Sequence, residues 1–158
     1  MQKSLLSHEL SEADPTYSRS QEVAVALLHA ADLVSLRLTR LLRKFGLSMA
    51  AFNILRVLRR AGEPLACAEV AKRMITPAPD ITRLIARLEK QGLVERTRRP
   101  ADKRLVLVSI TAAGLETLKQ LDAPVSSLHK QVMTPLKKSQ KKQMLAALEM
   151  LAAGMADG

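Results

Sequence analysis

Residues 65–111 constrain what this chain can fold into more than any other stretch. They form a short amphipathic segment, a break, a second amphipathic segment, and two β-branched runs joined by a basic connection. The first segment, residues 67–74, places apolar and charged side chains on different sides of a short helix. Pro77 and Pro79 end that helix, because proline lacks an amide hydrogen and pushes the preceding residue out of helical geometry. The pattern predicts two helices separated by a tight turn.

The second amphipathic segment, residues 79–91, has the composition of a helix that packs on one side only. Its apolar residues follow the spacing of one buried face and are Ile81, Leu84, Ile85 and Leu88. Pro79 suits the first turn of a helix and Gly92 suits its end. With Thr82 and Arg83 near its start, this helix can lie in a DNA major groove, because Arg binds guanine bidentately and hydroxyls bind bases or phosphates. An ordinary surface helix with solvated charges is the alternative.

Two β-branched runs, residues 93–97 and 105–110, flank a charged connection that contains Pro100. This pattern predicts a β-hairpin. The basic residues of its predicted tip are Arg98, Arg99, Lys103 and Arg104. Arginine from such a loop can enter a narrow minor groove, and Asp102 can orient the guanidinium of Arg104 by a charge-assisted hydrogen bond. The alternative is a charged tip that only keeps the hairpin soluble.

Four motifs follow one another in this stretch: EVA at residues 69–71, TRLIARLEKQGLVER at 82–96, DKR at 102–104 and SITAAG at 109–114. With these motifs the chain resembles the DNA-binding domain of the MarR family (multiple antibiotic resistance regulators). The resemblance implies a winged helix-turn-helix, with a recognition helix in the second motif and a wing that contains the third. Ala66 stands where that family usually has Ser or Thr, so the start of the first helix lacks a side-chain cap.

Helical segments flank this region on both sides. Residues 20–46 carry apolar side chains in a near-heptad rhythm, which predicts a long helix that needs a partner along its length. Residues 49–61 predict a second helix, and Thr111 is a suitable N-cap for a helix after the hairpin. Pro124 predicts a kink or break in that helix, and Pro135 separates it from a last helix. The predicted domains are a flexible arm at 1–19, a dimerisation helix at 20–46, a winged helix-turn-helix at 47–111 and dimerisation helices at 112–158.

The composition favours helices and an anionic partner. Hydrophobic residues make up 47% of the chain but aromatic residues only 2%, so the core must be built from aliphatic side chains. We expect a mainly α fold with a small β-hairpin wing. The net charge of +10 attracts phosphate, and it is polarised: residues 56–104 hold thirteen Lys or Arg and six Asp or Glu, whereas residues 1–35 hold two and five.

These observations predict a sequence-specific, dimeric transcriptional regulator, expected to be a repressor, that binds a pseudo-palindromic operator in double-stranded DNA. Candidate contacts from the recognition helix are Ala78, Asp80, Thr82, Arg83 and Arg87. Candidate contacts from the wing are Arg98, Arg99, Asp102, Lys103 and Arg104. A non-specific architectural DNA-binding protein is the alternative. The three histidines are scattered, and no phosphate-cradling loop or metal-ligand spacing occurs, so we expect no enzyme, cofactor or metal.

The resemblance also implies a small phenolic or amphipathic effector, bound between the dimerisation region and the DNA-binding lobe. The pocket walls should come from the first helix, the second helix and the start of the helix after the wing. On the first helix, His29, Arg37 and Arg40 are the polar residues that can meet an anionic effector, although a surface or interface role is the alternative for each.

The single cysteine, Cys67, excludes an internal disulfide and a cysteine-rich zinc site. A redox-sensing regulator acting through Cys67 is a further alternative, to be set against simple packing of a small side chain. The sequence contains no apolar run long enough to span a membrane and no signal-peptide pattern at its start, so we expect a cytoplasmic location.

Overall fold

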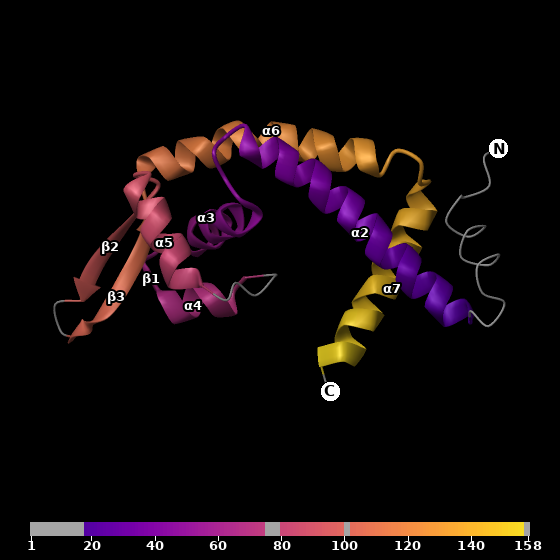
Figure 1. The fold of residues 1–158 in the computed structure, drawn as a ribbon, viewed down its shortest axis with the longest axis horizontal. Helices are drawn as coiled ribbons and strands as arrows, with labels where there is room; N and C mark the ends of the chain where they lie inside the picture. The colour runs from indigo at the N-terminus through magenta and orange to yellow at the C-terminus, as the bar shows by residue number, and fades with distance from the viewer. Residues whose placement is uncertain (1–17, 75–79, 100–101, 157–158) are drawn as a thin grey trace. The chain divides into compact units, whose positions relative to one another are not determined.

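The computed structural model describes residues 18–74, 80–99 and 102–156 (Figure 1). It divides into two compact units, residues 1–49 and residues 50–158, and each is considered by itself. In chain order, the elements are α2 (Arg19–Arg43), α3 (Met49–Ala61), β1 (Leu65–Ala66), α4 (Cys67–Lys72), α5 (Ile81–Lys90), β2 (Val94–Arg99), β3 (Asp102–Ile110), α6 (Ala112–Val132) and α7 (Lys138–Ala156). The prediction of a mainly helical chain with a small β wing is confirmed.

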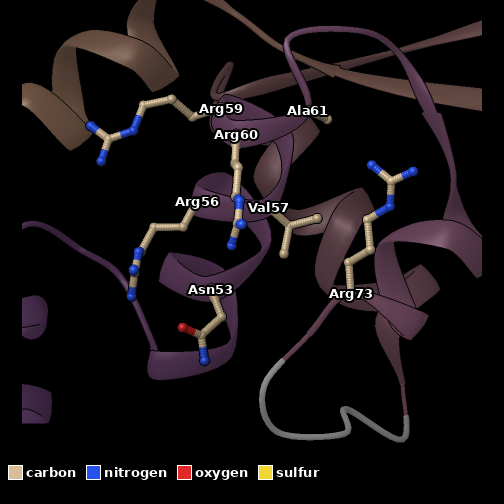
Figure 2. Close-up of a pocket in the computed structure, with 7 residues that line it drawn as sticks. All are labelled: Asn53, Arg56, Val57, Arg59, Arg60, Ala61 and Arg73. Atoms are coloured by element: carbon tan, nitrogen blue, oxygen red, sulfur yellow. The ribbon is translucent and has the colours of Figure 1, made fainter.

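Helix α3 is the centre of the core in the second unit. Its bounds are those predicted, and Phe52, Leu55 and Leu58 are buried as expected. The core continues into α4, α5, the sheet and α6, where its other buried hydrophobic residues are Leu65, Val70, Met74, Ile85, Leu88, Val94, Val108, Leu118 and Leu121. No described polar or charged residue is buried with them. The opposite side of α3 carries polar side chains, including Asn53, Arg56 and Arg60 (Figure 2).

The three strands form one antiparallel sheet in the order β1-β3-β2. Strand β1 was not predicted; it has two residues, and Leu65 pairs with Val108 in the middle of β3. The predicted hairpin tip was also wrong in extent, because β2 continues to Arg99 and β3 resumes at Asp102. A register shift falls between Arg98 and Arg99. The ladder of backbone hydrogen bonds extends the hairpin beyond its apolar residues, because an exposed antiparallel ribbon needs no buried face.

Helix α6 runs without interruption from Ala112 to Val132, so the helix does not break at Pro124, whereas the kink that was predicted as the other outcome stays a prediction. Proline removes one helical hydrogen bond, but the helix is held by burial in the preceding turns, where Leu118 and Leu121 are fully buried. Thr111 caps α6 as predicted, and Pro135 lies between α6 and α7 as predicted. Among the described residues, none of the helices combines the length and apolarity that crossing a membrane requires.

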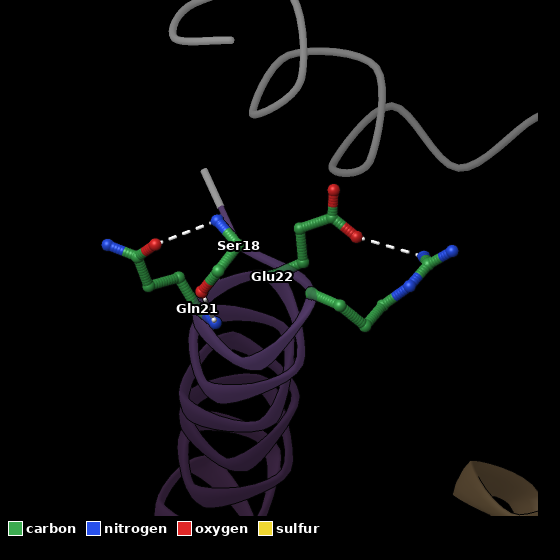
Figure 3. A network of polar contacts seen from close by, with 4 residues as sticks. Ser18, Gln21 and Glu22 are labelled. Carbon is green, nitrogen blue, oxygen red and sulfur yellow. Dashed lines mark hydrogen bonds and ion pairs between the residues drawn. The ribbon is translucent and has the colours of Figure 1, made fainter. Parts of the chain in front are cut away.

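The first unit is dominated by α2, which begins with a capping box at Ser18 (Figure 3). The Ser18 amide donates to Gln21 Oε1 at 2.8 Å, and the Gln21 amide donates to Ser18 Oγ at 3.3 Å. These bonds satisfy two donors that the first turn of a helix leaves free. Helix α2 therefore starts one residue earlier than predicted, at Arg19, and residues 1–17 of the predicted arm lie outside the described residues.

Candidate nucleic-acid interface

Helix α5 buries one face and exposes the other, as its spacing predicted. Ile85 and Leu88 are buried, and Ile81 and Leu84 are half-buried. The other faces expose Thr82, Arg83, Arg87 and Lys90. Three cationic side chains and one hydroxyl are thus presented by a helix whose apolar face is fixed in the core, which is what a groove-binding helix requires.

The start of α5 differs from the prediction. The helix begins at Ile81 and not at Pro79, and Asp80 takes the N-cap position without a side-chain cap hydrogen bond. The Asp80 carboxylate lies 3.8 Å from Arg83 Nη1, and both side chains are largely exposed. An exposed ion pair at this distance is weak, so the Arg83 guanidinium is free to exchange Asp80 for another acceptor. Ala78 and Pro79 lie outside the described residues.

Helix α4 precedes α5 and has the uncapped start that the sequence predicted. Ala66 occupies its N-cap position and makes no side-chain hydrogen bond. The helix ends at Lys72, two residues before the predicted end, and Val70 anchors it in the core. Cys67 at its first position is a half-buried free thiol. The redox alternative at this residue stays a prediction.

An ion pair between Glu89 and Arg96, called the brace below, joins the recognition helix α5 to the hairpin. Arg96 on β2 donates from Nε to Glu89 Oε2 of α5 at 2.7 Å. The hydrogen bond from Arg96 is the main cause that lowers the pKa of Glu89 below its ordinary value, and the same bond raises the pKa of Arg96. Both side chains therefore stay charged at neutral pH. The sequence contained both residues within one motif, but their spacing gave no sign that they meet.

A second junction connects the end of α5 to the start of α6. Thr111 Oγ1 donates to the Gly92 carbonyl at 2.7 Å and accepts from the Gly114 amide at 3.1 Å, while the Thr111 amide donates to the Leu93 carbonyl at 3.1 Å. A Cβ atom on Gly114 would collide with the Leu93 carbonyl oxygen and lie 2.7 Å from Ile110 Cγ1. Only glycine allows this backbone approach. The SITAAG motif thus has a structural role in orienting the recognition helix.

The hairpin carries the remaining predicted DNA contacts. Arg98 is exposed on β2, where its backbone is opposite Val106. The backbone of Arg99 pairs with that of Asp102. The side chains of four predicted wing residues lie outside the described ones, namely Arg99, Asp102, Lys103 and Arg104. Their backbone belongs to the strands and not to the loop that the sequence predicted, so a contact with DNA would come from the end of a ribbon.

The predicted effector residues His29, Arg37 and Arg40 are all exposed on α2. A cavity of about 480 Å³ lies in the second unit, and none of these three residues lines it. It is lined by Phe52, Arg56, Arg59, Asp122, Val125, Ser126, His129, Lys130, Met133 and Lys141. Helix α3 contributes to its lining, and α6 contributes residues of its second half. The lining combines apolar and cationic side chains.

An ion pair between Arg59 and Asp122 forms part of this lining. Two hydrogen bonds of 2.9 Å join the Arg59 guanidinium of α3 to the Asp122 carboxylate of α6. The pKa of Asp122 is lowered mainly by this contact. Such a bidentate pair has a fixed geometry, so it helps to set the position of α6 against α3. It was not predicted, because the two residues are far apart in sequence.

Comparison with known proteins identifies relatives of this architecture. The family model described as "MarR family" matches residues 45–105. The transcriptional repressor IacR of Pseudomonas putida is 27% identical over 112 residues, which are 71% of this chain and 66%, just under two thirds, of the repressor. A crystal structure of a MarR transcription factor from Planctomyces limnophilus is 36% identical, with a TM-score of 0.68, and the match covers 85% of this chain and 98% of that one. An organohalide-sensing transcriptional regulator crystallised with 2,4-dichlorophenol has a TM-score of 0.81 at 21% identity, over 89% of this chain and 83% of that one.

Proposed function

The chain belongs to the MarR family of transcriptional regulators, and from this we propose that it binds a pseudo-palindromic DNA operator as a homodimer and represses transcription. The observation that supports the proposal is the exposed row of Thr82, Arg83 and Arg87 on a helix held in the core and braced to a basic hairpin. Two such helices would enter successive major grooves about 34–36 Å apart. A regulator of chromosomal operators acts where the chromosome is, so a cytoplasmic location is part of the proposal.

The recognition helix supplies the sequence-specific contacts in this proposal. Asp80, Thr82 and Arg83 contact base edges, Ala78 approaches a thymine methyl group, and Arg87 binds a phosphate. Arg83 is suited to its role because its exposed, 3.8 Å pair with Asp80 is easily exchanged for guanine O6 and N7. The Glu89–Arg96 brace keeps the helix at a constant angle to the hairpin during this exchange.

The wing supplies the minor-groove and backbone contacts. Arg104 enters the minor groove and Asp102 orients its guanidinium, while Arg98, Arg99 and Lys103 bind phosphates and fix the register. The exposure of Arg98 on β2 is consistent with a phosphate contact. Because phosphate contacts carry no sequence information, loss of any one of these three should weaken binding to all duplexes alike.

The dimer would be formed by the helices at the two ends of the chain. Helix α2 exposes Val23, Leu28, Leu33 and Leu36, and α7 exposes Met144, Leu145, Met150, Leu151 and Met155. None of the described residues of α7 is buried. Many exposed apolar side chains on two helices favour an interaction site, and a second copy of the chain supplies equally apolar helices. Sedimentation equilibrium should therefore find a dimer.

We further propose that an amphipathic or phenolic small molecule releases the operator. The cavity of about 480 Å³ between α3 and α6 has the mixed lining that such a ligand needs, with Phe52, Val125 and Met133 for an aromatic ring and cationic groups for its polar end. A transcriptional regulator with the same fold was crystallised with 2,4-dichlorophenol. His29, Arg37 and Arg40 remain candidates for additional effector contacts. The ligand must favour the conformation that does not bind DNA, because it can shift the equilibrium only by its differential affinity.

The decisive experiment is a selection of bound duplexes from a random pool. We expect a recovered palindrome that the purified chain binds at least a hundredfold more tightly than a scrambled duplex at moderate salt. Arg83→Gln should lose that preference, whereas Lys119→Gln, an exposed residue of α6, should retain it. Equal affinity for random and selected duplexes would instead support a non-specific architectural protein.

A further inference from the structure

A second cavity, of about 700 Å³, lies along the polar side of α3 and is dominated by arginine (Figure 2). Its described lining residues are Asn53, Arg56, Val57, Arg59, Arg60, Ala61 and Arg73, and none of these is acidic. Figure 2 shows that Arg56, Arg59 and Arg60 come from α3, whereas Arg73 comes from the end of α4. Arginines from two separate elements therefore line one concave surface, and in this view the guanidinium groups of Arg56 and Arg60 extend to the same side while those of Arg59 and Arg73 extend away from them. We call these seven residues the arginine cavity.

In the described part of the chain, Arg59 is the one arginine of the four that is hydrogen-bonded to a carboxylate. Arg59 is held by Asp122 through two hydrogen bonds of 2.9 Å. Arg73 Nε lies 3.9 Å from Glu69 Oε2, too far for a hydrogen bond, and both side chains are exposed by more than two fifths. The Arg56 guanidinium lies 5.6 Å from the centre of the Phe52 ring, and its charge also helps to lower the pKa of Asp122, although no ion pair joins the two within the described residues.

Arg60, the fourth arginine of the cavity, has no ion-pair partner within the described ranges of the chain. It stands four residues after Arg56 on α3, a spacing at which like charges repel and destabilise a helix. The negative end of the helix dipole favours cations in the last turn of α3, where Arg59 and Arg60 lie, but it does not explain why Arg56 and Arg73 line the same cavity. An anion bound in the cavity would relieve the repulsion between the guanidinium groups of Arg56 and Arg60.

We propose that the arginine cavity binds a small, multiply charged anion, either a phosphate ester or a polycarboxylate. Arg56, Arg60 and Arg73 provide the charge-assisted hydrogen bonds, because guanidinium groups match carboxylate and phosphate oxygens bidentately. The Asn53 amide adds a neutral donor. Val57 and Ala61 give the wall an apolar strip that accommodates the organic part of the ligand.

This site is separate from the proposed DNA contacts, and it differs from the cavity proposed for the effector in most of its lining residues. None of its residues belongs to the proposed DNA contacts, and its volume and concave shape suit a small molecule better than the convex backbone of a duplex. It shares Arg56 and Arg59 with the cavity beside α6, but the lining of that cavity includes the carboxylate of Asp122, which repels a multiply charged anion. The two cavities therefore suit different ligands.

Isothermal titration calorimetry on the full chain tests the proposal, with pyrophosphate and citrate as separate probes at fixed ionic strength and without DNA. We expect saturable binding of one ion per chain for at least one probe. The double variant Arg60→Gln/Arg73→Gln should weaken that binding at least tenfold. The charge-matched control Arg43→Gln/Lys119→Gln, whose residues are exposed and lie outside the cavity lining, should bind like the parent. Circular dichroism melting of each variant verifies that it folds.

Three results would overturn the proposal. One is the absence of saturable binding for both probes, and another is an equal loss in the charge-matched control, which would indicate general attraction of anions to a basic chain. The third is displacement of the bound ion by a selected duplex, which would place the cavity on the DNA-binding face. Because the measurement uses no DNA, a chain that binds pyrophosphate but recognises no operator would refute the proposed function and leave this site intact.

Discussion

Replacing Gly114 by alanine places a methyl group against the backbone of the turn that follows the recognition helix. The added Cβ would collide with the Leu93 carbonyl oxygen and lie 2.7 Å from Ile110 Cγ1. The Ile110 side chain can rotate away, but the Leu93 carbonyl cannot, because it accepts the Thr111 amide at 3.1 Å. The turn after α5 and the first turn of α6 must therefore move apart.

The expected magnitude is the difference between two opposing effects. Alanine is favoured over glycine inside a helix by about 1 kcal/mol. Forcing a methyl group into a closely packed position costs about 1–3 kcal/mol, and the upper part of that range applies where the obstacle is backbone. We expect Gly114→Ala to lower the free energy of unfolding by about 1–2 kcal/mol, and each kcal/mol should lower the melting temperature by about 2–4 °C in a chain of this size.

Urea unfolding at constant protein concentration measures this effect, because the stability of the proposed dimer would depend on concentration. Gly154→Ala in α7 is the matched control, since no described atom lies within 4 Å of its added Cβ, and it should be neutral or stabilising by up to about 1 kcal/mol. If Gly114→Ala were as stable as the parent, the close approach of α6 to the Leu93 carbonyl would not constrain the fold. The assignment of the SITAAG motif as a junction would then be wrong.

Four further predictions concern DNA binding, pH and assembly. Arg83→Gln should weaken binding to the selected operator by about 1–3 kcal/mol in fluorescence anisotropy, because it removes a bidentate base contact. Arg104→Ala should cost a similar amount in gel-shift titration, about 1–3 kcal/mol, and should relax the preference for A·T pairs beside the half-sites. The hydrogen bond from Arg96 lowers the pKa of Glu89, so the ion pair should stabilise the fold fully above the ordinary pKa of 4.5 and lose this effect as the pH falls through the lowered pKa. The free energies of unfolding that urea gives for the parent and for Glu89→Gln should therefore become equal in acid. Leu151→Glu in exposed, apolar α7 should shift sedimentation equilibrium towards monomer.

Each of these predictions has an outcome that contradicts it. Unchanged operator affinity would remove Arg83 or Arg104 from the interface. A constant stability difference between the parent and Glu89→Gln at all pH values would mean that the brace contributes through packing and not through charge. A fully dimeric Leu151→Glu variant would place the dimer interface elsewhere on the chain.

Helix bounds, buried helix faces and helix caps were predicted correctly where residues close together in the sequence determine them. The bounds of α3, the buried face of α5 and the uncapped start of α4 follow from periodicity and from residues that favour or fail helix caps. The Thr111 cap was predicted for the same reason. In each case the interacting groups are separated by a few residues along one element, so the order of residues specifies the geometry.

The sequence by itself thus determined the order and type of the elements other than β1, together with the basic, polar face of the recognition helix. The tertiary structure decided which distant groups are brought together: Glu89 with Arg96, Arg59 with Asp122, and Arg73 with residues of α3 around one cavity. It also decided that β1 forms and that α6 continues through Pro124. The physical reason is the same for all of these. A strand ladder, a buried helix turn or an ion pair is stabilised by partners that packing brings together, and no local pattern records their distance.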